Sequence, residues 1–122
     1  MIAWISGFLL SRGHDWVVIR TDGGVGYKVV CPSRCLKDRV VGSEIELHVH
    51  MSVSERDISL FGFSEERDIE AFHALSSISG IGNRTAVTIL DGLPPSSLVR
   101  AIREEDKSSL ARIKGVGPKT AA

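Results

Sequence analysis

Two stretches of the sequence carry the same residues in the same order, and each has the composition of an anion-binding turn. They occupy residues 75–86 and 110–121, thirty-five residues apart. In both stretches leucine, isoleucine, glycine, an aliphatic residue, glycine, a basic residue, threonine and alanine recur at matching places. A match of this kind at a fixed interval predicts a duplicated supersecondary unit.

Each copy predicts a helix that ends, a Gly-aliphatic-Gly turn that reverses the chain, and a second helix. The glycines permit unusual backbone dihedrals and leave no side chain to hold a ligand away. The amides that open the second helix lack acceptors, and the helix dipole favours an anion there. We therefore expect phosphate contacts from Gly80, Ile81, Gly82, Asn83, Arg84 and Thr85, and from Gly115, Val116, Gly117, Pro118, Lys119 and Thr120.

Two other interpretations of these glycines are weaker. A single Gly-x-Gly at a helix end is often only a C-cap, but duplication together with a basic residue and a threonine favours phosphate binding. A nucleotide-binding P-loop is excluded for residues 115–120, because Pro118 precedes Lys119 and the required first glycine is missing. We expect no cofactor.

A metal site is also disfavoured. Cys31 and Cys35 could be combined with His48 and His50, but Cys-x3-Cys without a second cysteine pair is a weak zinc signal. We expect two reduced structural cysteines and no metal.

Composition limits the class of protein. The 122 residues are 43% apolar and 25% charged, with a net charge of zero, which is typical of a globular chain and argues against a uniformly basic polyanion binder. The last sixteen residues nevertheless carry four basic residues and no acid, so a local cationic face is available. Without a signal peptide or long apolar run, we expect a cytoplasmic protein with no membrane contact.

The first half of the chain predicts five strands, at residues 2–10, 15–21, 26–31, 44–53 and 58–63. Alternation is clearest over residues 44–50, where one face is apolar and the other polar. Glycines at residues 23–26 predict a turn, and residues 33–40 predict a helical turn after the third strand. Five short strands with glycine corners indicate a small OB-like barrel, with Trp4 and Trp16 expected in its core.

From residue 64 the apolar period becomes helical, with Ser64 as the expected N-cap and acidic residues in the first turn. The fold class is therefore α+β, a five-stranded barrel domain at 1–63 followed by a helical domain at 64–122. The helical domain would contain both helix-hairpin-helix motifs, the second of them truncated.

The whole chain resembles the RuvA family. The resemblance rests on Met1-Ile2 with Gly7, on residues 23–27 (Gly-Gly-Val-Gly-Tyr), on residues 60–63 (Leu-Phe-Gly-Phe) and on the two hairpins. It implies a non-catalytic subunit that recognises four-way (Holliday) junction DNA in the RuvAB branch-migration complex, in homologous recombination and DNA repair. It further implies a homotetramer, with one or two tetramers on a junction, and RuvB and RuvC as protein partners.

The resemblance also implies an acidic pin, two adjacent acids in the turn between the last two barrel strands. Here Glu55 matches the first acid, Arg56 stands where the second is usual, and Asp57 follows. We assign the pin to Glu55 and Asp57, against the alternative of a solvated charged turn. Family members continue into a third domain that binds the RuvB motor, so we expect this chain to be a fragment without that contact.

Two other classes of function remain as alternatives. Helix-hairpin-helix motifs accompany DNA-repair enzymes, but no catalytic lysine, carboxylate pair or metal cluster stands near either hairpin; the nearest acid, Asp91, precedes a Gly-Leu-Pro-Pro helix stop. A general structure-specific DNA-binding module, or a protein-interaction module with an OB barrel, is the other alternative. The duplicated basic hairpins argue against the interaction module.

Overall fold

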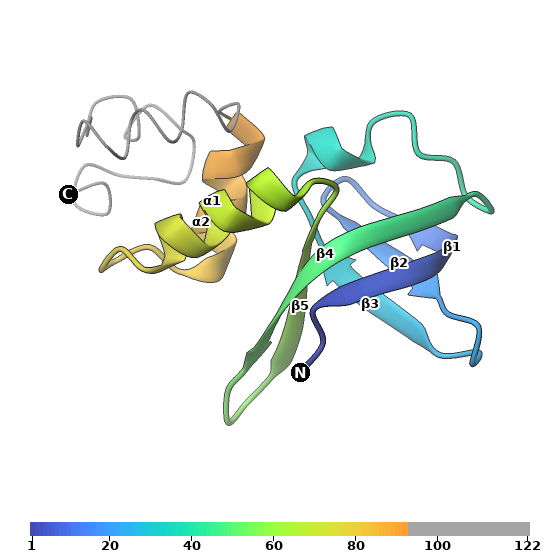
Figure 1. Cartoon of the computed structure of the whole chain (residues 1–122), viewed down its shortest axis with the longest axis horizontal. Coiled ribbons are helices and arrows are strands. Elements are labelled where there is room, and N and C mark those ends of the chain that lie inside the picture. Colours follow the sequence, from blue (N-terminus) through green and yellow to red (C-terminus); the bar gives the residue numbers. More distant parts are fainter. Residues whose placement is uncertain (93–122) are drawn as a thin grey trace. The chain divides into compact units, whose positions relative to one another are not determined.

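The computed structural model describes residues 1–92, and five strands in it close into a barrel (Figure 1). The strands are β1 (Trp4–Arg12), β2 (Trp16–Arg20), β3 (Gly26–Val30), β4 (Glu44–Val53) and β5 (Ile58–Phe63). A 3-10 helix, η1 (Ser33–Leu36), follows β3, and two α-helices follow the barrel, α1 (Glu66–Ser76) and α2 (Asn83–Gly92). The predicted barrel followed by helices is confirmed.

The strand order around the barrel is β1-β2-β3-β5-β4. All neighbouring pairs are antiparallel except β3 and β5, which run parallel through Val29↔Leu60 and Val30↔Phe61. The parallel pair closes the barrel, because it joins strands that η1 and β4 separate in the sequence. Closure leaves no long unpaired edge in the body of the barrel.

The barrel core consists of the inward side chains of each strand. In β4 the buried residues are Ile45, Leu47 and Val49, while Glu44 and Glu46 on the opposite face are exposed. This is the alternation that the sequence predicted. The remaining members of the core are Ile5, Leu9, Val17, Ile19, Val29, Cys31, Leu36 and Leu60.

The prediction that Trp4 belongs to the core is wrong. Ile5 and Leu9 point inward, and alternation along β1 therefore turns Trp4 and Phe8 outward, where Trp4 is 54% exposed. Trp16 is only partly buried, and the Lys28 ammonium lies 5.1 Å from its ring centroid. Both tryptophans thus lie outside the apolar core.

Two glycines of the barrel are required by the close approach of neighbouring strands. A Cβ on Gly7 would lie 2.3 Å from the carbonyl oxygen of Arg20, and one on Gly62 would lie 2.6 Å from Cγ1 of Val29. Neither distance is compatible with a side chain. The turn between β2 and β3 contains Gly24 at φ +86°, as the glycine run predicted.

The chain divides into two units, the first spanning Met1–Ile69 and the second beginning at Glu70, within α1. Helix α1 begins two residues after the expected Ser64 cap, because the Glu65 carbonyl accepts the first helical hydrogen bond, from Ile69.

In the second unit the buried positions recur at helical spacing, at Phe72 and Leu75 in α1 and at Ala86, Ile89 and Leu90 in α2. Among residues 1–92, neither α1 nor α2 has the length and apolar character of a membrane-spanning helix.

Candidate nucleic-acid interface

The first predicted hairpin connects α1 to α2 through a compact turn. After α1 the amide of Ile78 donates to the Leu75 carbonyl at 3.0 Å, and the amide of Ile81 donates to the Ile78 carbonyl at 3.1 Å. Gly80 has φ +89°, a conformation that side-chain-bearing residues rarely adopt. The turn therefore depends on glycine at residue 80 for its backbone geometry.

Ile81 and Gly82 have different structural roles in this turn. Ile81 is 4% exposed and anchors the turn in the helical unit. The Gly82 carbonyl accepts a 2.9 Å hydrogen bond from the Ala86 amide, so Gly82 is the N-cap of α2. A Cβ added to Gly82 would meet nothing within 4 Å, and the space in front of this helix start is therefore open.

The start of α2 has the donors that an anion requires. An N-cap at Gly82 leaves the amides of Asn83, Arg84 and Thr85 without carbonyl acceptors inside the helix. The Arg84 side chain is exposed and forms no ion pair within residues 1–92. Three amides, the positive end of the helix dipole and one free cation could thus act on a single bound anion.

The six expected contact residues of the second copy, Gly115, Val116, Gly117, Pro118, Lys119 and Thr120, lie outside the described residues. Their assignment to DNA stays a prediction from the repeat.

The turn between β4 and β5 is the expected site of the acidic pin. The Ser54 amide donates to the Asp57 carbonyl at 2.8 Å, and the Asp57 amide donates to Oγ of Ser54 at 3.2 Å. Glu55 and Arg56 therefore form the two-residue tip, and Asp57 begins the return to β5. The Asp57 carboxylate accepts a 2.8 Å hydrogen bond from the Ser59 hydroxyl, so the two predicted pin acids differ in position and in environment.

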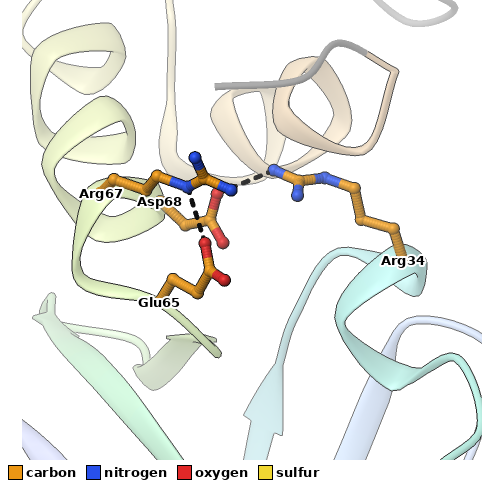
Figure 2. Close-up of polar contacts among 4 residues, drawn as sticks. All are labelled: Arg34, Glu65, Arg67 and Asp68. Carbon is orange, nitrogen blue, oxygen red and sulfur yellow. Dashed lines mark hydrogen bonds and ion pairs between the residues drawn. The ribbon is translucent and has the colours of Figure 1, made fainter. Parts of the chain in front are cut away.

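The start of α1 carries a buried charge that the sequence did not reveal (Figure 2). Asp68 is 1% exposed, and its Oδ1 accepts a 2.9 Å hydrogen bond from the guanidinium of Arg34 in η1. An unpaired carboxylate at such a site would be costly, so the ion pair ties the first turn of α1 to η1. The neighbouring Glu65–Arg67 pair, at 2.6 Å, is exposed and contributes little to stability.

The two cysteines are both free and buried. Burial raises the pKa of the Cys31 thiol to about 12, with a further contribution from Cys35. Such a thiol stays protonated at neutral pH and is a poor nucleophile and metal ligand. Within the described part of the chain no group of three His, Cys, Asp or Glu side chains could hold a metal ion.

Comparison with known proteins covers nearly the whole chain. Residues 1–62 match the family model "RuvA N terminal domain", and residues 72–122 match "SAM-like Helix-hairpin-helix tandem". The curated relatives include three proteins named Holliday junction branch migration complex subunit RuvA. They come from Desulforamulus reducens (43% identical over 99% of this chain), Parvibaculum lavamentivorans (41% over 100%) and Cutibacterium acnes (37% over 100%). The chain spans 60% of the length of each of these three relatives.

Proposed function

This chain belongs to the RuvA family, and on that basis we propose that it binds four-way junction DNA through backbone phosphates. In this role it would be the junction-recognition part of a branch-migration complex in recombination and repair. The observation that carries the proposal is the start of α2, where an open N-cap glycine and an exposed arginine stand together.

The chemistry of this site favours a phosphate over a base edge. Main-chain amides are donors only and are the same in every residue, so they can hold a phosphate oxygen but cannot distinguish one base pair from another. Arg84 adds a charge-assisted contact to the same phosphate. The second hairpin, with Lys119 in the equivalent place, would hold a second phosphate, and affinity would then be independent of base sequence.

We assign no catalytic role to the chain. The relatives are named as a subunit of a branch-migration complex, which supports a binding role in which ATP-driven motion comes from the RuvB motor. We propose RuvB as the motor partner, without assigning its contact to any of these 122 residues. The proposal also includes a homotetramer, with one or two tetramers on each junction, cooperation with RuvC and a cytoplasmic location.

The proposal is tested by titrating a fluorescent four-way junction and a linear duplex of the same sequence at several salt concentrations. We expect tighter binding to the junction, no response to shuffling the base sequence, and a steep salt dependence. Arg84→Ala should lower the slope of log K against log salt by about 0.9 if one phosphate contact is lost.

Arg67→Ala is the matched control, because Arg67 is also an exposed arginine at the second residue of its helix. Equal slopes for the Arg84 and Arg67 variants would contradict the phosphate clamp at α2. Equal affinity of the unaltered chain for junction and duplex would contradict junction recognition itself.

A further inference from the structure

The hairpin of β4 and β5 extends beyond the barrel as a two-stranded ribbon (Figure 1). β4 pairs with β1 only as far as His48, and β5 pairs with β3 only at Leu60 and Phe61. The pairing of β4 with β5 continues past these points to Val53↔Ile58. The last residues of the two strands are therefore supported by each other alone.

The end of this ribbon has one apolar and one polar face. Val53 and Ile58 form a cross-strand pair, and each is 64% exposed. The adjacent pair, Ser52↔Ser59, faces the opposite side. Two branched apolar side chains thus lie side by side in solvent, directly behind the charged tip.

This apolar face continues the core stripe of β4 beyond the place where the core ends. Ile45, Leu47 and Val49 are buried in the barrel, and Met51 is partly buried against the same cluster. Val53 is next in the same alternation, but it lies past the last pairing of β4 with β1, at His48, and is exposed. The pair is available for a contact with another molecule.

We propose that the Val53–Ile58 pair packs against the faces of bases that are uncovered at the branch point of a four-way junction. The inference rests on the proposed function. In continuous duplex an apolar side chain must first unstack two bases, which costs free energy, whereas a branch point interrupts the stack and removes that cost. The pair therefore selects branched over continuous DNA without reading sequence.

Two observations favour bases over a second copy of the chain as the partner. Arg56 stands at the tip next to the pair, and its guanidinium can contact a phosphate or stack on a base. A patch of two side chains is also far smaller than the roughly 800 Å² per partner that a stable protein interface buries.

The test uses a junction with 2-aminopurine beside the crossover, whose emission reports base stacking. The unaltered chain should change this emission on binding, and the double variant Val53→Ser with Ile58→Ser should not. The same variant should reduce the preference for junction over duplex on the order of tenfold. Ile58→Val, which keeps a branched apolar side chain, should behave as the unaltered chain does.

Val40→Ser is the matched control, because Val40 is another valine that is 66% exposed on the same unit. If the double variant behaves like Val40→Ser in both readouts, the proposed contact between the pair and the bases is wrong, and the phosphate site at α2 is unaffected. If the double variant instead loses its oligomeric state by light scattering, the pair joins copies of the chain and the proposed contact with bases is overturned. Equal binding of junction and duplex by the unaltered chain would overturn the proposed function as well.

Discussion

Replacing Gly82 with aspartate should move stability and DNA binding in opposite directions. Gly82 is the N-cap of α2, it is not among the glycines with positive φ, and a Cβ there has open space. Aspartate is a better N-cap than glycine and its charge favours the helix dipole, so we expect a gain of about 0.5–1 kcal/mol in the free energy of unfolding. In a thermal melt this corresponds to a rise of about 2–4 °C in Tm.

The same carboxylate would occupy the place assigned to a DNA phosphate. At about 5 Å, repulsion between the two charges is roughly 1–3 kcal/mol for effective dielectric constants between bulk water and a protein surface. The carboxylate would also accept hydrogen bonds from the amides that the phosphate needs. We expect junction affinity to fall by about one to two orders of magnitude, with the second hairpin supplying the remaining binding.

The assay combines thermal unfolding with anisotropy titration of a fluorescent junction. Gly82→Asn separates the effect of capping from the effect of charge, because asparagine caps the helix but is neutral. It should therefore weaken junction binding less than aspartate does. Gly23→Asp is the matched control, an exposed barrel glycine with open space that receives the same charge. Junction affinity that is equal in the Gly82→Asp and Gly23→Asp variants would refute the phosphate site. A loss of stability in Gly82→Asp would refute the N-cap assignment.

Three further predictions follow from buried or hydrogen-bonded groups. Arg34→Ala should destabilise the fold by about 2–3 kcal/mol, because it leaves the buried Asp68 carboxylate without its ion-pair partner. Asp68→Asn should cost only about 1 kcal/mol, because a partly exposed arginine can return to water. Equal losses of unfolding free energy in urea would contradict this asymmetry. The folded-state pKa of Cys31 lies above its unfolded value of 9.0. The free energy of unfolding should therefore be unaffected by this thiol below pH 9 and fall by up to about 1.4 kcal/mol per pH unit toward pH 12. Cys31→Ala should remove this fall between pH 9 and pH 12. Glu55→Gln should raise duplex affinity relative to the junction more than Asp57→Asn does, because the Asp57 carboxylate is already hydrogen-bonded within the ribbon. In a competition titration at fixed salt, an unchanged junction-to-duplex ratio in both variants would mean that the tip is only a solvated turn.

Local features of the fold were predictable because neighbouring residues encode them. Alternation over residues 44–50 indicated the inward face of β4, and the glycine run at 23–26 indicated the turn with Gly24 at positive φ. The hairpin was predictable for the same reason, because turn geometry, an N-cap and a basic residue are all specified within a few positions of each other. Its DNA contacts stay a prediction.

Features that depend on barrel closure could not be derived in this way. Asp68 lies in a first helical turn, where acidic residues are common. Its burial depends on its ion pair with Arg34, which lies thirty-four positions away in the sequence. The sequence predicted the wrong side of β1 as inward, because Trp4 was expected in the core. Packing of Ile5 and Leu9 in the barrel instead turned Trp4 out to solvent.

The sequence by itself determined the order of elements, the repeat and the chemistry of the first hairpin turn. Only the tertiary structure decided that Gly62 lies against Val29 and that the apolar stripe of β4 continues past the core to Val53. The physical reason is that dihedral preferences and side-chain alternation are set between near neighbours, whereas burial is set by which distant strands pair and where their pairing stops.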